Sequence, residues 1–173
     1  MDEESSAELL TCRERAEGGE SEAQFGLGFR CAARGGETDY EEAAGWYRKA
    51  AVQSHPLAQF NLGIMYSKGQ GVPRDKAISL RWMGSAAELG DAGAQYEFGM
   101  RQHRLSLDLE PAAGLELRIE AYKWLLLAAA QDYAESVAGC ETVAMDLTHP
   151  EVLEGRHRAQ IFVPVANGKR NIE

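Results

Sequence analysis

The sequence predicts an all-α protein, a right-handed α-α superhelix (solenoid) of stacked antiparallel helix hairpins. A first motif recurs three times, as SEAQFGLGFRC from Ser21, PLAQFNLGIMY from Pro56 and AGAQYEFGMRQ from Ala92. A second motif follows each copy, as AAGWYRKAA, SLRWMGSAA and AYKWLLLAA. The copies begin 35 and 36 residues apart. Self-similarity at this period indicates helix hairpins that stack to bury a shared core. Only IFVPV near the end has strand character, and its proline argues against a strand.

The first motif predicts a helix with one small, closely packed face. In the second copy Ala58, Leu62 and Tyr66 recur at i, i+4 and i+8, and so share a face. A glycine follows the large apolar residue in every copy, at Gly28, Gly63 and Gly99. Because a glycine inside a helix costs about 1 kcal/mol relative to alanine, its recurrence predicts close approach of a neighbouring helix.

The second motif predicts a helix in which a tryptophan lies among small residues. Trp46 has Ala43 three residues before it and Ala50 four residues after it, and Trp82 and Trp124 have equivalent small neighbours. We therefore expect all three tryptophans to be buried. Thr38 or Asp39 and Asp75 are the expected N-caps of the first two of these helices, and Thr148 with Glu151 predicts a capping box for a final helix that reaches about Phe162. Ser5 with Glu8 predicts a short leading helix.

These signals divide the chain into consecutive repeats within a single domain, residues 1–173. We expect a capping helix (7–20), repeat 1 (21–55), repeat 2 (56–91), repeat 3 with an insertion (92–132), a degenerate repeat 4 with the closing helix (133–164), and a tail (165–173). The insertion, RLSLDLEPAAGLEL from Arg104, replaces the turn of the third hairpin. Its role and that of the basic tail are left open.

The segment GQGVPRD could be a phosphate-binding loop or a turn between two helices. A dinucleotide fingerprint needs a third glycine and a preceding strand, but position 74 is Arg74 and a helix precedes. Gly69 and Gly71 allow the positive φ of a helix end, and Pro73 prevents continuation of the helix. The segment is interpreted as a structural turn.

Composition and charge exclude several classes of function. The formal net charge is −9, which argues against nucleic acid as a partner. The longest apolar run, 124–130, is too short to cross a bilayer, which needs about 20 residues. The N-terminus lacks the features of a secretory signal. Three widely spaced cysteines suit reduced thiols, so we expect a cytoplasmic protein, although a leader removed earlier would leave no trace.

The recurring pattern A-Q-[FY]-x-[LF]-G, the turn G-x-G-V-x-x-D and the pattern A-x-x-W-x-x-x-A-A resemble the Sel-one-like repeat (SLR) family, which is related to the tetratricopeptide repeats. Residues 56–91 match almost throughout, residues 21–55 lack the glycine-valine turn, and residues 92–132 depart most. The stretch LTHPEVLEGRHRAQIFVP is similar to the closing helix of bacterial SLR proteins. The resemblance implies a helical solenoid that holds protein partners, and a bacterial origin.

Some SLR proteins are associated with β-lactam binding or hydrolysis, so a hydrolase is an alternative. A serine acylating enzyme of that kind needs Ser-x-x-Lys, and no lysine here has a serine three residues before it. The chain has no H-E-x-x-H motif, and His149 and His157 lie two helical turns apart. We expect no enzymatic activity, cofactor or metal. A homo-oligomeric structural protein remains a further alternative, and the oligomeric state is open.

Specificity in a solenoid is expected at the positions of the first helices that vary between repeats. A mixed apolar and basic surface there would suit a peptide or partner protein with apolar and carboxyl groups. The candidate partner-binding residues on the concave face are Phe29, Arg30, Asn61, Ile64, Met65, Glu97, Met100, Arg101 and Arg104.

Overall fold

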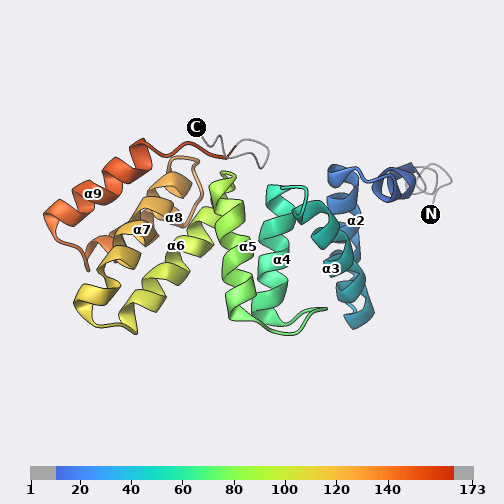
Figure 1. The fold of residues 1–173 in the computed structure, drawn as a ribbon, viewed down its shortest axis with the longest axis horizontal. Helices are drawn as coiled ribbons and strands as arrows, with labels where there is room; N and C mark the ends of the chain where they lie inside the picture. Colours follow the sequence, from blue (N-terminus) through green and yellow to red (C-terminus); the bar gives the residue numbers. More distant parts are fainter. Residues whose placement is uncertain (1–10, 166–173) are drawn as a thin grey trace. The chain divides into compact units, whose positions relative to one another are not determined.

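The computed structural model describes residues 11–165, and every regular element in that range is a helix. The chain divides into two compact units, unit 1 (Met1–Trp82) and unit 2 (Met83–Glu173), and Figure 1 labels the helices along it. Unit 1 contains a helical segment over residues 11–17, followed by α2 (Ser21–Arg34), α3 (Glu37–Ala51) and α4 (Pro56–Lys68). Helix α5 (Lys76–Glu88) begins in unit 1 and ends in unit 2. Unit 2 continues with α6 (Ala92–Leu107), α7 (Pro111–Ala129), α8 (Ser136–Ala144) and α9 (His149–Gln160).

Neighbouring helices pair through short turns whose residues suit sharp changes of direction. Gly35 and Gly69, the C-caps of α2 and α4, have φ of 79° and 74°, and Gly71 has φ of 62°. A backbone hydrogen bond closes the turn after α4, in which the Asp75 N–H donates to the Tyr66 carbonyl at 2.9 Å. This geometry confirms that GQGVPRD is a helix-connecting turn.

Side chains at the helix starts satisfy backbone N–H groups that have no partner within the helix. Asp75 accepts from the Ile78 N–H at 2.9 Å, as predicted for the start of α5. The capping box predicted at α9 is present, with Thr148 N–H donating to Glu151 at 2.6 Å. Asp91 caps α6 in the same way, accepting from the Ala94 N–H at 2.7 Å.

The predicted cap of α3 was wrong, because that helix begins earlier, at Glu37, with Gly36 as its N-cap. The left-handed turn at Gly35 lets α3 start directly after α2. The Asp39 carboxylate instead accepts from Arg34 Nε at 2.6 Å, across the short link between the two helices. The residues of the predicted leading cap, Ser5 and Glu8, lie outside the described residues.

The insertion of the third hairpin lengthens helices and does not form a long loop. Helix α6 runs to Leu107 and α7 starts at Pro111, so only three residues, 108–110, connect them. Further along, α9 ends at Gln160, two residues before the predicted end.

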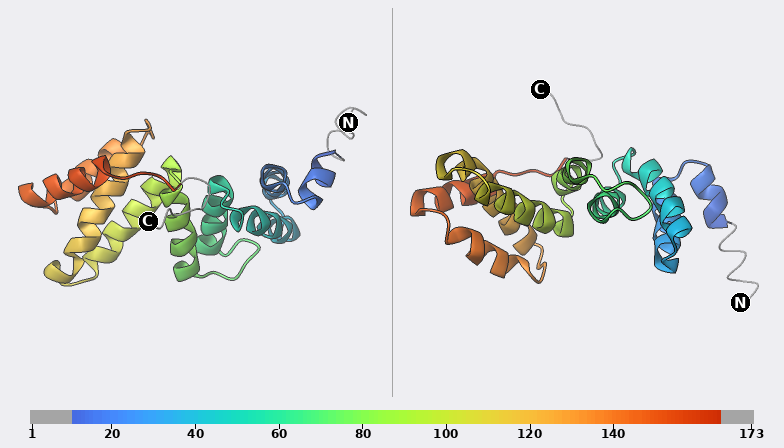
Figure 2. Two further views of the ribbon diagram at one scale, coloured as in Figure 1. Left: turned by 45° about the horizontal axis from the view of Figure 1, so that its top comes forward. Right: turned by 90° about the horizontal axis from the view of Figure 1, so that it is seen from below.

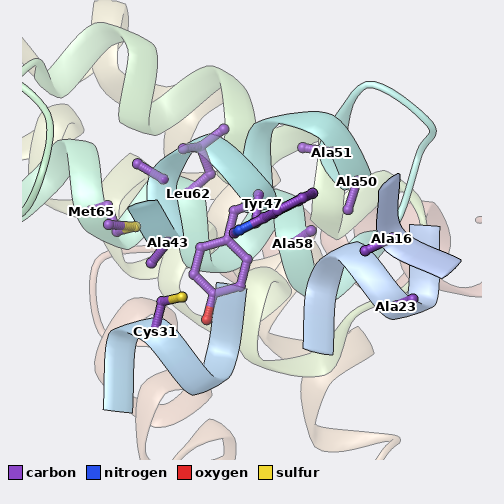
Figure 3. Close-up of a cluster of buried hydrophobic side chains, with 12 residues drawn as sticks. Ala16, Ala23, Cys31, Ala43, Tyr47, Ala50, Ala51, Ala58, Leu62 and Met65 are labelled. Atoms are coloured by element: carbon purple, nitrogen blue, oxygen red, sulfur yellow. The ribbon is translucent and has the colours of Figure 1, made fainter. Parts of the chain in front are cut away.

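The core of unit 1 packs small residues around the Tyr47 ring (Figure 3), and Trp46, Leu62 and Met65 are its other large side chains. Tyr47 on α3 is fully buried, with Ala43 and Ala50 on the same face of its helix. A Cβ atom added to Gly28 on α2 would lie 2.7 Å from the Tyr47 ring. The close approach predicted from the glycine column is therefore confirmed here, and it recurs at Gly99, where a Cβ would lie 3.0 Å from the Ala121 carbonyl oxygen.

The residue after each tryptophan, and not the tryptophan, is the most deeply buried large side chain of the second helix. Tyr47, Met83 and Leu125 are each at most 1% exposed. Trp46 and Trp124 are buried at the flank of these stripes, whereas Trp82 is only half-buried and the prediction for it was wrong. The buried stripe follows i, i+4, i+7 from Ala43 and Ala121, which places Tyr47 and Leu125 at its centre.

A glutamine ties the start of each first helix to the end of the helix before it. The side-chain Nε2 atoms of Gln24, Gln59 and Gln95 donate to the carbonyls of Ala16, Ala51 and Ala87, at 3.0, 2.9 and 3.2 Å. Each bond spans eight residues and is a second hydrogen bond to its carbonyl, which also accepts from a backbone N–H of the following turn. The amide oxygens of Gln24 and Gln95 in turn accept from Gln53 and Gln131, at 2.8 and 2.9 Å.

Replacing Gly28 with alanine is expected to destabilise unit 1 by about 1–3 kcal/mol, because the new methyl would overlap a buried, rigid ring. A Cβ atom added to Gly26 on the same helix would have no neighbour within 4 Å. Gly26→Ala should therefore stabilise the helix by about 0.5–1 kcal/mol, in line with propensity alone. Urea unfolding of both variants measures the difference, and equal effects would contradict the close packing.

Gln24→Leu is expected to cost about 1–3 kcal/mol of unfolding free energy, because it removes two hydrogen bonds, one to the Ala16 carbonyl and one from the Gln53 amide. Gln53→Leu should cost less, since Gln53 is exposed to water and the variant keeps the buried bond between Gln24 and the Ala16 carbonyl. The same urea titration compares the two variants. A Gln24→Leu protein no less stable than Gln53→Leu would show that the bond between helices contributes little.

Candidate functional site

The candidate partner-binding residues lie along one stripe of each first helix. Equivalent positions of the repeats are Phe29, Ile64 and Met100, and one residue further Arg30, Met65 and Arg101. The stripe on α2 and α4 belongs to unit 1 and that on α6 to unit 2.

In unit 1, α2 presents an exposed aromatic ring beside an exposed cation. Phe29 is 58% exposed, and Arg30 next to it is also exposed. The Phe29 ring contacts Phe25, with centroids 6.3 Å apart, and Phe25 in turn stacks on His55 at 4.7 Å and contacts Tyr47 at 5.9 Å. Because Tyr47 is fully buried, the surface ring rests on an aromatic series that reaches the core.

His55 holds this aromatic series against the start of α4. Its Nδ1 accepts from the Ala58 N–H at 3.3 Å, so the ring hydrogen lies on Nε2, which faces the Glu22 carboxylate at 3.0 Å. Sequence reasoning missed the roles of Phe25 and His55. The aromatic position of the A-Q-[FY] pattern was the signal available for Phe25.

On α4 the stripe is less exposed than predicted. Asn61 uses its amide to donate to the Leu57 carbonyl at 2.7 Å, and Ile64 is half-buried. Met65 is only 4% exposed and belongs to the core of unit 1, so its placement on the binding surface was wrong (Figure 3). An apolar methionine is stabilised by burial at this position, whereas the charged Arg30 stays exposed at the equivalent one.

On α6 in unit 2 the stripe is mainly charged. Glu97 lies 3.6 Å from Arg101 Nε within the helix, and Arg104 is exposed. Met100 is half-buried and packs against the cluster formed by α7 and α8; a Cβ on Gly139 would lie 3.5 Å from its sulfur. Of the four predicted side chains on α6, Glu97, Arg101 and Arg104 thus remain the ones with polar groups at the surface.

The buried thiols and histidines have structural surroundings. Burial raises the pKa of the Cys31 thiol, and it raises the pKa of Cys140 to about 11. Both thiols are therefore protonated at neutral pH, which opposes nucleophilic chemistry. His103 on α6 lies 2.8 Å from Asp146, which follows α8, and so links two helical segments of unit 2.

Metal sites and membrane-spanning helices are two further features that a helical protein can carry. Residues 11–165 contain no cluster of three or more histidine, cysteine or acidic side chains suited to a metal ion. No helix among them combines the length and apolar character needed to cross a membrane.

The densest charged cluster of unit 2 joins α7 to α9. Arg158 contacts Glu116, donates to Glu120 at 2.8 Å and donates to Glu154 at 2.7 Å. Lys123 adds a bond to Glu120 at 2.7 Å. Burial would raise the pKa of the Glu120 carboxyl, but the hydrogen bonds from Lys123 and Arg158 outweigh it and leave this pKa below its usual 4.5. The cluster therefore stabilises the packing of α9.

The chain is built from helix hairpins whose buried small residues recur between repeats, whereas exposed residues of the first helices differ. This combination defines the class of tetratricopeptide-like helical repeat proteins. The family model described as Sel1 repeat matches residues 21–55, 56–91 and 118–133. The chain belongs to the Sel1 repeat family, whose members are typically protein–protein interaction modules. The predicted fold class and family are confirmed.

Solved structures support the same fold. A protective antigen of uropathogenic Escherichia coli strains, described as displaying an SLR fold, aligns with 89% of this chain and 32% of its own, at 28% identity and a TM-score of 0.77. A Sel1 repeat protein from Oxalobacter formigenes aligns with 78% of this chain and 98% of its own, at 31% identity and a TM-score of 0.65.

Two curated relatives from Arabidopsis thaliana match a shorter region. HRD3A, an ERAD-associated E3 ubiquitin-protein ligase component, is 40% identical over 62 residues, and HRD3B, of the same description, is 40% identical over 55. The matches cover 36% and 32% of this chain, but only 9% of each relative.

The charged cluster predicts a specific dependence of stability on pH. Because the pKa of Glu120 is lower in the folded chain than in the unfolded one, its stabilisation is complete above about pH 4.5 and is lost as the pH falls through the folded value. At pH 7 the unfolding free energy of the wild type should be about 1 kcal/mol larger than that of Glu120→Gln. Thermal melts from pH 7 to 3 should show this difference shrinking below pH 4.5. The exposed control Glu141→Gln should show no such change, and a constant Glu120→Gln difference down to pH 3 would refute the assignment.

Proposed function

We propose that this chain is a non-catalytic interaction scaffold that binds a protein or peptide partner on the exposed stripe of its first helices. The binding centre is the face of α2 that carries Phe29 and Arg30, extended by Asn61 and Ile64 on α4. Glu97, Arg101 and Arg104 on α6 supply a second, charged contact region. The partner presents an apolar side chain and a carboxylate.

The exposure of Phe29 carries this proposal. A phenylalanine that is 58% exposed leaves much of its ring in water, where an apolar group of a partner can cover it. Its contact with Phe25 keeps the ring in place, which lowers the entropy cost of binding. The adjacent guanidinium of Arg30 can donate two parallel hydrogen bonds to a carboxylate. Aromatic and arginine side chains dominate binding energy at many interfaces.

The test is a double substitution, Phe29→Ala with Arg30→Glu, in the full chain. Both side chains are exposed, so the melting temperature should change by no more than about 2 °C. Partners are captured from a lysate of the source organism and measured by quantitative mass spectrometry. The double variant should recover at least tenfold less of the specific partner than wild type does. Arg101 is left unchanged because its reversal would place two like charges at Glu97 and position 101.

A matched control is Val52→Ala with Arg74→Glu, which also removes one exposed apolar side chain and reverses one exposed arginine in unit 1. The control should retain the partner. Equal recovery by the test and control variants would move the binding site away from α2.

The state of the cysteines supports a proposal for the cellular compartment of the protein. Cys12, Cys31 and Cys140 are all free thiols, a state that a reducing compartment maintains. We therefore propose a cytoplasmic location.

A further inference from the structure

After α9 the chain continues as an extended segment that returns across unit 2. This C-terminal strap, residues 161–165, runs from the end of α9 back to the end of α5 (Figures 1 and 2). It contains no helix or strand, and its sequence is Ile-Phe-Val-Pro-Val. The contacts of Phe162, Pro164 and Val165 show how unit 2 holds it.

An aromatic pair anchors the first half of the strap. Phe162 meets Trp124 of α7 edge to face, with centroids 5.2 Å apart and planes at 74°. Trp124 meets Phe98 of α6 in the same manner at 5.7 Å. The Lys123 ammonium lies 4.0 Å from the Trp124 ring centroid and 5.7 Å from that of Phe162. We call the residues Phe98, Lys123 and Trp124, together with the α5–α6 turn at Glu88 and Gly90, the strap surface.

Backbone and proline contacts anchor the second half of the strap. The Val165 N–H donates to the Glu88 carbonyl at 2.9 Å, at the last residue of α5, where carbonyls lack partners within the helix. Pro164 lies over Gly90, because a Cβ on that glycine would be 3.4 Å from the proline ring. Gly90 has φ of 93°, a conformation that favours glycine and keeps the turn free of a side chain.

The strap combines anchored residues with apolar residues in water. Ile161 and Val163 are 64% and 80% exposed, while Phe162 and Val165 are half-buried. A segment that belonged to the core would bury the β-branched side chains of Ile161 and Val163. One aromatic anchor, one backbone hydrogen bond and one proline contact are instead typical of an extended peptide bound to a receptor surface.

We propose that the strap surface is a peptide-binding site for extended segments of the form aromatic-x-Pro-apolar, and that the chain's own strap occupies it as an internal competitor. This site lies in unit 2 and does not depend on the α2 face proposed above. A tethered ligand has an effective concentration on the order of millimolar, so the surface is free in only a fraction of molecules. The apparent affinity for an external peptide is reduced by that fraction.

The experiment supplies the strap as a separate peptide to the full chain. The probe is a synthetic peptide of residues 160–166, Gln-Ile-Phe-Val-Pro-Val-Ala, with blocked ends. The receptor variant Phe162→Ala weakens the internal strap and leaves the strap surface intact. Calorimetric titration should show at least tenfold tighter peptide binding to Phe162→Ala than to wild type. The control variant Val163→Ala changes an exposed strap residue and should bind like wild type.

A second peptide and a second variant complete the test. The peptide carrying Phe162→Ala should bind the opened receptor at least tenfold more weakly than the parent peptide. Should the Phe162→Ala chain fail to fold by circular dichroism, Val165→Pro opens the strap by removing the N–H that donates to Glu88. Peptide binding that is equal for wild type and the opened variant, or absent from both, would overturn the proposal. A wild-type dimer that dissociates on Phe162→Ala would also overturn it, since the occupant would then be a second copy.

Discussion

Close approach of the helix backbones is the constraint on which the other contacts depend. The Tyr47 ring lies where Gly28 has no side chain, and a single added methyl would come within 2.7 Å of it. Alanines that are fully buried, among them Ala43, Ala58, Ala94 and Ala121, line the same interfaces. At this spacing, a glutamine on one helix can reach a carbonyl at the end of the preceding helix. Small side chains thus determine where the polar bonds form.

The same spacing separates structural residues from those left for binding. The alanines and the glycine that face a neighbouring helix recur in every repeat, whereas the position of Phe29 carries a different residue in each repeat and that of Arg30 changes to Met65 in the second. His55 shows how the two sets connect, because it caps α4, stacks on Phe25 and faces Glu22. Rigid support of this kind gives an exposed ring a defined position, which a ring on a loop would lack.

The two proposed surfaces use similar chemistry in different states. Each pairs an aromatic side chain with a cation, Phe29 with Arg30 on α2 and Trp124 with Lys123 on α7. The α2 surface is exposed, while residues 161–165 of the same chain cover the other. A partner for the first binds directly, and a partner for the second must displace a tethered segment. Their affinities are therefore expected to respond differently to changes in the C-terminal residues.

The sequence alone was sufficient for the family, the helix order, the helix-connecting turn at Gly69 and Gly71, and the caps at Asp75 and Thr148. These features depend on spacing and on local backbone chemistry, which a single sequence records. Only tertiary structure decided that Tyr47, and not Trp46, lies at the centre of its buried stripe, that Met65 is buried, and that the strap rests on Trp124. Neighbouring positions on a helix point about 100° apart, so Trp46 and Tyr47 cannot both lie at the centre of the buried face. Both side chains are aromatic, and packing against residues distant in the sequence decides between them.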